Sequence, residues 1–377
     1  MKIKSLKLTN FRNFLKLELN FISPTIIIVG PNGRGKTNLL EAIYQAGTTK
    51  SFRTIYNTQL INYQADFCRI EILTKPQTDP QFLIEVAINR NPARGFLKKF
   101  KINHVTKKLT QALGKIKVVF FSPESLNLIT GSPTARRKYL DLLISLVDKK
   151  YLRLLLVLFR VLKNRNKLLE AIGEGRSEEG ELNFWNKELA RVASYIILRR
   201  WQVTKFLSSY SQESYREISQ KLEDRMRIKY LSRPMESRGD WDKLVADKFQ
   251  KEIFIIMRKM ITEKQSQEIA QGRSLIGPQR DNLIFVLNDH DLSAFGSRGE
   301  VRSAILALKI AEAQYLAQKS SGEPPVLLLD DVFSELDQMR RKKLLKLINK
   351  TQTFITTTEL GKIDPALKKK AQIIKLV

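Results

Sequence analysis

The chain has 377 residues, enough for two or three domains or for one large domain that carries an insertion. Lysines and arginines number 66 against 38 aspartates and glutamates, and the net charge of +28 favours a polyanionic partner: nucleic acid first, then an acidic membrane surface or an acidic protein. A single cysteine and two histidines exclude an intrachain disulfide framework, a cysteine-based zinc site and a multi-histidine metal site.

The N-terminal sequence MKIKSLKLTNFRNF alternates charged and apolar residues and lacks the apolar core of a signal peptide. No stretch approaches 18 uncharged apolar residues, so no membrane-spanning helix is expected. Together with the low cysteine content, this predicts a protein of the reducing cytoplasm.

Short strands are predicted along the first hundred residues. Apolar residues alternate with charged ones in segments 3–8, 15–19, 69–73 and 82–88, and Thr25–Val29 is a β-branched run suited to a strand buried on both faces. Asn89–Gly95 is typical of a turn, which predicts 96–102 as a hairpin partner. A helix is expected over Asn38–Ala46.

The residue composition and the spacing of apolar residues change near Ser132. Leu, Lys, Arg and Glu recur at helical spacing from Pro133 to about Glu268, with a loop at Gly173–Gly180. Strand patterns return at 283–287, 326–329 and 353–357, and helices are predicted over 301–319 and 338–349. We therefore expect an α/β domain built from residues 1–131 and 269–377, with a helical arm, residues 132–268, inserted into it.

A phosphate-binding loop is the most specific motif. It directly follows the Thr25–Val29 strand and precedes a helix, which is the context that such a loop requires. Its glycines let backbone N–H groups face the β-phosphate, the lysine places a positive charge between the β- and γ-phosphates, and the threonine hydroxyl is a Mg²⁺ ligand. The predicted ATP-binding residues are Gly30, Pro31, Asn32, Gly33, Arg34, Gly35, Lys36 and Thr37.

Two acids end a second buried strand. Four apolar residues, Val326–Leu329, lead into Asp330 and Asp331, so the strand delivers carboxylates to the edge of the sheet where α/β proteins bind ligands. We expect Asp330 to hold the metal ion and Asp331 to orient or deprotonate the attacking water. Lys36 and Asp331 are thus the predicted catalytic residues.

The sequence Ser297-Arg298-Gly299-Glu300 opens the 301–319 helix and allows two interpretations. One is a helix N-cap with an early acidic residue. The other is a second anion site, in which Ser297, the Gly299 amide and the helix dipole face a γ-phosphate.

The order of these elements resembles an ABC-type ATPase of the SMC-like branch, and within it the RecF family of bacterial recombination and repair. The matching segments are LTNFRNF at 8–14, GPNGRGKTNLLEAIY at 30–44, FFSPESLNLITGSPTARRKYLD at 120–141, GPQRDNL at 277–283, LALKIAE at 306–312, LLLDDVFSELD at 327–337 and TFITTT at 353–358. The arm matches loosely.

The resemblance implies an ATPase head that is discontinuous in sequence and that dimerises on ATP. It implies that Ser297, Arg298 and Gly299 of one subunit cap the nucleotide of the other, and that Ser334–Asp337 crosses the interface. It also places Arg12 and Asn13 near the nucleotide. Thr356–Thr358 stand where transporter relatives carry a switch histidine.

The sequence departs from the family pattern in three places. Glu300 replaces the usual signature glutamine, which puts a negative charge near the partner's phosphates unless Arg298 or Arg302 offsets it. Gln279 replaces the histidine that usually precedes Arg280. No glutamine can be assigned to the metal-contacting Q-loop.

The expected function is therefore an ATP-gated protein of recombinational repair and replication that hydrolyses ATP slowly, with stimulation by DNA. Its implied partners are double-stranded DNA near single-strand gaps, a second copy of the chain, and mediators of the RecR and RecO type, with recombinase loading as the outcome. The phosphate contacts are expected from a cationic run and from the base of the arm: Lys98, Lys99, Lys101, Lys107, Lys108, Arg136 and Arg137, with Arg94 at the start of the run.

Two other functions are less consistent with the sequence. A transporter's nucleotide-binding subunit is disfavoured by the basic arm, the net charge and the threonines at the switch position. A chromosome-organising SMC scaffold would need a coiled coil of hundreds of residues, and the predicted arm is too short.

Overall fold

A computed structural model describes the whole chain except residues 78–79, 92–94, 237–238, 240 and 377. The chain forms two compact units. Unit 1 comprises Met1–Leu126, Glu213–Leu222 and Arg302–Val377, and unit 2 comprises Asn127–Gln212 and Glu223–Val301. Two helices, α6 (Leu182–Ser219) and α10 (Arg298–Gln318), contribute residues to both units.

A parallel sheet of five strands is the centre of unit 1. The three middle strands, β3, β13 and β12, are almost wholly buried, which accounts for their apolar and β-branched composition. Because every neighbouring pair is parallel, the carboxyl ends of these strands gather at one edge of the sheet. The strand order is β14 (Gln372–Lys375), β3 (Thr25–Val29), β13 (Thr353–Thr357), β12 (Val326–Asp330) and β8 (Val118–Phe121).

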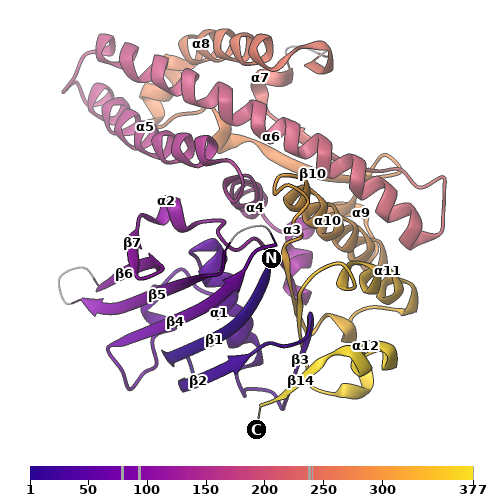
Figure 1. The fold of residues 1–377 in the computed structure, drawn as a ribbon. Helices are drawn as coiled ribbons and strands as arrows, with labels where there is room; N and C mark the ends of the chain where they lie inside the picture. Colours follow the sequence, from indigo (N-terminus) through magenta and orange to yellow (C-terminus); the bar gives the residue numbers. More distant parts are fainter. Residues whose placement is uncertain (78–79, 92–94, 237–238, 240, 377) are drawn as a thin grey trace. The chain divides into compact units, whose positions relative to one another are not determined.

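Unit 1 also contains an antiparallel sheet of six strands (Figure 1). Burial alternates along β1 and β4, as expected for strands with one face on a core. Helix α1 (Lys36–Thr48) joins the buried side chains of both sheets in one apolar cluster. The strand order is β2 (Phe14–Asn20), β1 (Lys2–Phe11), β4 (Phe67–Lys75), β5 (Phe82–Asn91), β6 (Gly95–Ile102) and β7 (Val105–Lys107).

Helix α10 is long and mostly buried in unit 1, with Ile305, Leu308 and Leu316 among its buried apolar residues. The remaining helices of unit 1 are shorter. The others are α2 (Leu109–Ala112), α11 (Gln338–Ile348) and α12 (Pro365–Lys370).

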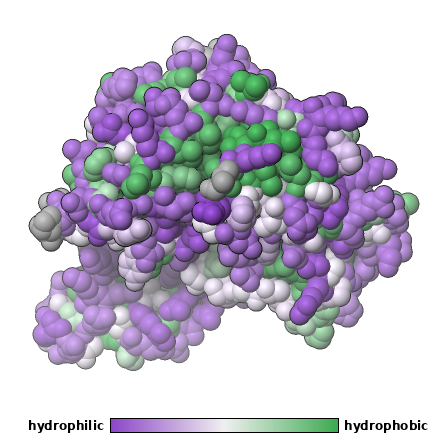
Figure 2. Space-filling view, turned by 90° about the horizontal axis from the view of Figure 1, so that it is seen from below, coloured by the Kyte–Doolittle hydropathy of each residue, from purple (hydrophilic) through white to green (hydrophobic). Residues whose placement is uncertain are grey.

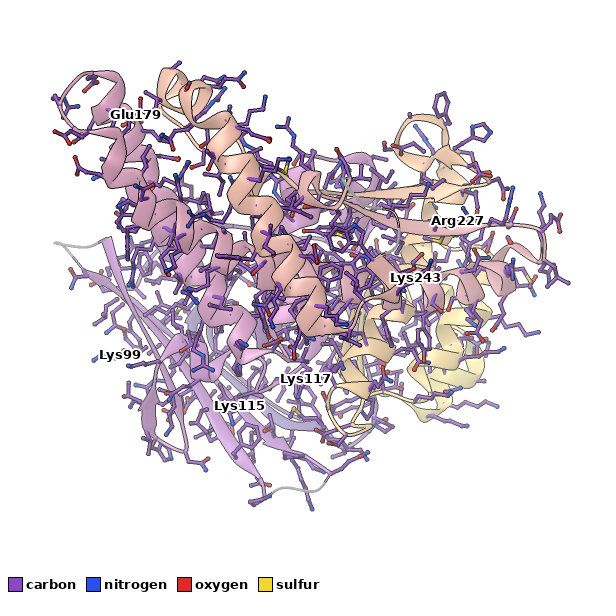
Figure 3. The ribbon with its side chains drawn as sticks, turned by 90° about the horizontal axis from the view of Figure 1, so that it is seen from above. Lys99, Lys115, Lys117, Glu179, Arg227 and Lys243 are labelled. Carbon is purple, nitrogen blue, oxygen red and sulfur yellow. The ribbon has the colours of Figure 1, made fainter. Side chains whose placement is uncertain are left out.

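Unit 2 consists of helices and a small antiparallel sheet. Strand β10 (Asn282–Leu287) lies between β9 (Met226–Leu231) and β11 (His290–Asp291). Figure 3 places Glu179 in the connection between α5 and α6, where the loop Gly173–Gly180 was predicted. The helices confined to this unit are α3 (Asn127–Thr130), α4 (Pro133–Ser145), α5 (Lys149–Gly173), α7 (Arg233–Glu236), α8 (Ala246–Gln271) and α9 (Leu292–Phe295).

Two buried arginines tie the elements of unit 2 together. The fully buried Arg165 of α5 donates to Glu268 of α8, at 2.5 Å. Arg200 of α6 bonds to Asp141 at 2.8 Å and donates to the carbonyl of Pro278 at 2.6 Å. Buried charges are tolerated only when paired, so loss of one partner would destabilise this unit strongly, by roughly 3–5 kcal/mol.

The predicted α/β class is confirmed, and most of the predicted elements are present. Residues 132–268 were predicted to be helical, but they include strand β9, which pairs with β10 in the small sheet of unit 2. The boundaries of the compact units differ from the predicted boundaries at 131/132 and 268/269. The division into an ATPase head and a helical arm therefore stays a prediction. The centre of the predicted turn Asn89–Gly95, including Arg94, lies outside the described residues.

The surface is mostly polar on the face that Figure 2 shows, where hydrophobic residues gather in one patch. The exposed large apolar residues of unit 1 include Leu15, Ile22 and Ile373. Across the described part of the chain, every helix is too short or too polar to cross a membrane.

Candidate nucleotide site

The loop Gly30–Thr37 connects β3 to α1 at the carboxyl edge of the parallel sheet. Gly35 has φ 93°, a left-handed conformation that favours glycine, and a Cβ there would lie 2.6 Å from the Asn13 side chain. A Cβ on Gly30 would lie 2.4 Å from the carbonyl oxygen of Leu376. The loop therefore passes too close to its neighbours for larger residues at these two positions. Helix α1 begins at Lys36, inside the motif, with Gly35 as its N-cap and no side-chain cap. Uncapped N–H groups at a helix start form a ready anion site.

Lys36 is held over this loop. Its Nζ donates to the carbonyl oxygens of Gly30, at 2.7 Å, and Pro31, at 2.9 Å. The residue is 9% exposed, so its ammonium group is buried against the loop.

Asp330 of β12 bonds to helix α1 and to strand β13 through one oxygen. Its Oδ1 accepts from the hydroxyl of Thr37, at 3.0 Å, and from that of Thr356, at 2.6 Å. β13 lies between β3 and β12, and this strand order brings Thr356 between the loop and the acid. Burial raises the pKa of Asp330 above its ordinary value, and the hydrogen bonds from Thr356 and Thr37 oppose that rise.

Asp331 adopts a left-handed backbone conformation, with φ 51°. Its N–H donates to Thr356 Oγ1, at 3.0 Å, and its carbonyl accepts from Ser334, at 2.7 Å. Thr356, at the predicted switch position, thus contacts both acids: its hydroxyl donates to one and accepts from the other.

These residues line one pocket of about 410 Å³. That volume lies in the usual range of small-molecule sites. The pocket brings the phosphate loop together with both acids. The predicted residues in its wall are Asn32, Gly33, Gly35, Lys36, Thr37, Asp330, Asp331, Thr356 and Thr358.

Arg12 and Asn13 lie around the pocket, and neither is among the described residues of its wall. Arg12 donates twice to the fully buried Glu41, at 2.9 and 2.7 Å, and also to the carbonyl of Gln59. Asn13 donates to the carbonyl of Arg34, at 3.3 Å. In this structure the two residues therefore support α1 and the loop from outside.

Five residues of the wall were not predicted from the sequence: Asn38, Arg53, Ser122, Pro123 and Glu124. Arg53 donates to Asn38 Oδ1, at 2.7 Å. Ser122 directly follows β8, so the rule that strand ends gather at one edge could have found it had the strand order been known. Arg53 lies in an irregular segment and gives no periodic signal.

The segment Ser297–Glu300 forms a reciprocal helix cap. Glu300 Oε2 accepts from the Ser297 N–H and hydroxyl, each at 2.8 Å, and the Glu300 N–H donates to Ser297 Oγ, at 3.3 Å. Arg302 forms an ion pair with Glu335 of the Ser334–Asp337 loop. The carboxylate of Glu300 is thus hydrogen-bonded within its own cap. Arg302 pairs with Glu335 and not with Glu300.

The structure corrects two of the predicted DNA contacts. Lys98 Nζ points inward and donates to the carbonyl of Thr49, at 2.8 Å, and to Asn57, at 3.0 Å. Burial lowers the pKa of Lys98 to about 7. Arg136 is 8% exposed and donates to the carbonyls of Ile129 and Gly131. Neither side chain is available to a phosphate.

The other predicted cations differ in exposure. Arg137 donates to the carbonyl of Asp281, at 2.8 Å, and is half-buried. Lys99 is exposed on β6, as Figure 3 shows, and Lys108 is also exposed. Lys101 and Lys107 are half-buried, and Lys107 stands opposite the buried Phe100 in the strand register.

A phosphate loop after a buried parallel strand, facing an acidic strand across one intervening strand, defines a P-loop ATPase head of the ABC type. The chain belongs to the family described as RecF/RecN/SMC N terminal domain, which matches residues 2–374, and within it to the RecF proteins.

The RecF relatives cover nearly the whole chain. The "DNA replication and repair protein RecF" of Pediococcus pentosaceus is 36% identical over 371 residues, 97% of this chain and 95% of that protein. Its Bacillus subtilis counterpart is 35% identical over 384 residues, 100% and 98% of the two chains. A solved structure of the recombination mediator protein RecF-ATP in the RecFOR pathway has a TM-score of 0.86 at 32% identity and covers 96% of this chain and 93% of that one.

More distant structures share the fold alone. The Smc head domain of Pyrococcus furiosus, with an extended coiled coil, has a TM-score of 0.53 at 16% identity. It covers 99% of this chain and 92% of that one.

Proposed function

We propose that this protein is an ATP-gated, DNA-binding ATPase of recombinational repair and replication, in which ATP binds at the pocket between Gly30–Thr37 and Asp330–Asp331. The observation that carries the proposal is the hydrogen bond from Thr37 to Asp330, which joins the phosphate loop to the acidic strand. The same two groups would have to hold a metal ion beside the phosphates. The ATP-bound structure of the RecF relative supports ATP as the ligand.

The donor set fits Mg²⁺. The hydroxyl of Thr37 and the carboxylate of Asp330 are hard oxygen ligands that already lie 3.0 Å apart. Within the described residues no group of three or more His, Cys, Asp or Glu side chains forms a metal cluster. Mg²⁺ in phosphate sites commonly takes one or two protein oxygens and completes its shell with phosphate oxygens and water, which matches this sparse set. When bound, the ion would neutralise phosphate charge.

Lys36 and Asp331 have separate roles in this proposal. The Lys36 ammonium leaves the carbonyls of Gly30 and Pro31 for the β- and γ-phosphates, exchanging neutral acceptors for charged ones. Asp331 lies in the pocket wall, one residue beyond the metal-binding acid, and orients or deprotonates the attacking water. Slow turnover fits a clamp that closes on ATP and opens after hydrolysis.

A second copy of the chain completes the site. The start of α10 would present the Ser297 hydroxyl and the amides around Arg298 and Gly299 to the γ-phosphate of the partner's nucleotide. The cap supports this role with a glutamate present, because Glu300 accepts from its own Ser297 and its charge is already hydrogen-bonded. The Arg302–Glu335 pair connects α10 to the Ser334–Asp337 loop, the second element assigned to the interface.

The DNA partner is inferred from charge. The excess of 28 positive charges favours a polyanion, and Lys99, Lys101, Lys107 and Lys108 supply candidate phosphate contacts outside the buried set. We propose duplex DNA near single-strand gaps as the substrate, and recombinase loading with RecR- and RecO-type mediators in the cytoplasm as the context. The RecFOR pathway named for the solved relative supports these partners.

The competing functions fit less well. An SMC scaffold would need a coiled coil of hundreds of residues, whereas the longest helix here, α6, has 38 residues and spans about 57 Å. A transporter subunit would work through a histidine switch, and Thr356 occupies that place with a hydroxyl bound to Asp330.

DNA binding is expected to depend on salt and little on sequence. Log affinity for a duplex of fixed length should fall linearly with log salt, at a slope of about −0.9 per neutralised phosphate. Lys99→Gln should make the slope less steep by about 0.9, the value of one phosphate contact. Lys98→Met, which replaces the neighbouring, inward-facing lysine, should leave the slope unchanged. Fluorescence anisotropy over a salt series measures both. A flat salt dependence, or equal effects of the two substitutions, would contradict the assignment.

A further inference from the structure

Helix α6 runs without interruption from one compact unit into the other. Its residues 182–212 belong to unit 2, and its residues 213–219 belong to unit 1. A continuous helix is a rigid element, so a displacement of its unit 2 part is carried to its end in unit 1. The contacts that this end makes within unit 1 therefore determine which groups such a displacement reaches.

The unit 1 end of α6 is fastened to helix α11. Glu217 accepts a hydrogen bond from Lys343 and lies 3.7 Å from the Nζ of Lys346. The hydrogen bond from Lys343 holds the pKa of Glu217 below its ordinary value, which keeps the carboxylate charged. Gln220, which lies just beyond the helix, donates to Met339 Sδ at 3.9 Å. The end of α6 thus contacts α11 through both an ion pair and a weaker polar contact.

Helix α11 in turn holds the loop Ser334–Asp337, which directly precedes it. Arg341 Nε donates to the carbonyl of Leu336, at 2.8 Å, and a second guanidinium nitrogen donates to the carbonyl of Phe333, at 2.7 Å. A shift of α11 therefore moves the backbone of this loop with it.

Helix α10, the other helix that contributes residues to both units, meets the same loop from its unit 1 part. Arg302 pairs with Glu335, and Arg340 Nε donates to Ser303 Oγ, at 3.0 Å. Both helices shared by the units thus contact α11 or the loop at its start. This loop is the place in unit 1 where the two connections from unit 2 converge.

The loop also fixes the backbone of Asp331, the proposed catalytic acid. Ser334 Oγ donates to the Asp331 carbonyl, at 2.7 Å, and the Asp331 N–H donates to Thr356 Oγ1, at 3.0 Å. Asp331 has φ 51°, a conformation that few residues other than glycine adopt. A general base must lie within hydrogen-bond reach of the attacking water, so a small movement of this loop changes the rate of hydrolysis.

We propose that α11 carries the state of α6 to Asp331, with Glu217 and Arg341 as positioning residues, and that DNA binding regulates ATP hydrolysis by this route. Unit 2 holds the larger part of α6 and also Arg137, a candidate DNA contact. The inference rests on the proposed function, in which DNA stimulates a slow ATPase. It predicts that the Glu217–Lys343 pair sets the response to DNA and leaves the affinity for ATP unchanged.

The first test measures ATP turnover of the full chain at saturating ATP, with and without a gapped DNA duplex. Glu217→Lys replaces attraction to Lys343 by repulsion, so it should keep the unstimulated rate and lose the stimulation by DNA. Adding Lys343→Glu reverses both charges of the pair and should restore most of the stimulation. Exposed ion pairs contribute little to stability, so these variants should fold normally. Fluorescence anisotropy should show the DNA affinity of the unmodified protein.

Glu213→Lys is the matched control for the change of charge. Glu213 is exposed one turn earlier on α6 and has no ion pair within the part of the chain that the structure describes. This variant should respond to DNA like the unmodified protein. An equal loss of stimulation in Glu213→Lys would show that net charge, and not the ion pair with Lys343, controls the response.

Arg341→Met tests the contact between α11 and the loop. Methionine is a long side chain that cannot donate to the carbonyls of Phe333 and Leu336. The variant should lower ATP turnover roughly tenfold or more, with and without DNA, because the loop no longer fixes Asp331. Its affinity for a fluorescent ATP analogue should stay as in the unmodified protein, which separates positioning of the acid from nucleotide binding.

Three further results would overturn the inference. They are normal stimulation by DNA in Glu217→Lys, no recovery in the double variant, and unchanged turnover in Arg341→Met. Glu217 is exposed, so its variants test the proposal even if Arg341→Met fails to fold. Absence of any stimulation by DNA in the unmodified protein would instead overturn the proposed function, so the two failures are distinguishable.

Discussion

Lys36→Ala is expected to lose ATP binding while keeping its fold. The substitution removes the ammonium that would contact two phosphates through charge-assisted hydrogen bonds, each worth about 1.5–3 kcal/mol. A loss of about 3 kcal/mol weakens affinity roughly 100-fold. Among the described residues, Lys36 bonds only to loop carbonyls, at 2.7 and 2.9 Å, so the folded chain loses little without it.

Titration with a fluorescent ATP analogue measures this effect, and the melting temperature checks the fold. Lys163→Ala removes an exposed lysine from α5 and serves as the control for the loss of one positive charge. It should bind ATP normally. Normal binding by Lys36→Ala would show that the phosphates lie elsewhere.

Asp331→Asn is expected to bind ATP and fail to hydrolyse it. The amide keeps the size of the side chain but cannot accept a proton, and general-base contributions amount to about 10²- to 10⁴-fold in rate. The backbone should tolerate the change, because Asp331 has φ 51° and asparagine adopts that conformation readily. Single-turnover ATP hydrolysis measures the rate directly.

Asp330→Asn is the comparison for this variant. It removes the charge from the group that bonds Thr37 and Thr356, so it should weaken ATP binding in the presence of Mg²⁺. Binding should therefore separate the two neighbours, with Asp331→Asn near normal and Asp330→Asn impaired. Identical behaviour would refute the division of roles between them.

The phosphate loop and the acidic strand were predictable because each is encoded locally. Gly30–Thr37 carries its own geometry in its glycines, and the apolar run Val326–Leu329 must be buried wherever the sheet forms. Their meeting at Thr37 and Asp330, which are 293 positions apart, followed from the rule that parallel strands end at one edge.

Strand β9 could not be found in the same way. Met226, Ile228 and Tyr230 alternate with cations over six residues, too few to stand out within a helical region. The strand exists because it pairs with β10, with Ile228 opposite Phe285, and a partner so distant in sequence leaves no local signal. Ser122 is a similar case, because its place depends on β8 lying next to β12.

The inward orientation of Lys98 could be predicted from the alternation of side chains along β6. Side chains alternate along a strand, so Lys98 and Phe100 of β6 share a face, and Phe100 is buried. A run of lysines on a strand therefore divides between two faces, and only one of them meets solvent. A prediction that treats this run as one continuous surface therefore places Lys98 on the wrong face.

We propose that two copies of the chain share each nucleotide, and the ATPase rate of mixed variants tests this sharing most directly. Ser297→Arg fills the proposed anion pocket with a bulky cation, whereas Lys36→Ala disables the phosphate loop. Alone, each protein should be inactive, because every site in its homodimer lacks one half. Mixed in equal amounts, they form heterodimers with one intact site, in which the Lys36 loop of the Ser297→Arg chain faces Ser297 of the other. We predict partial recovery of ATP hydrolysis in the mixture. Normal hydrolysis by Ser297→Arg alone would contradict the shared site and leave Ser297 as the helix cap that its bond to Glu300 forms.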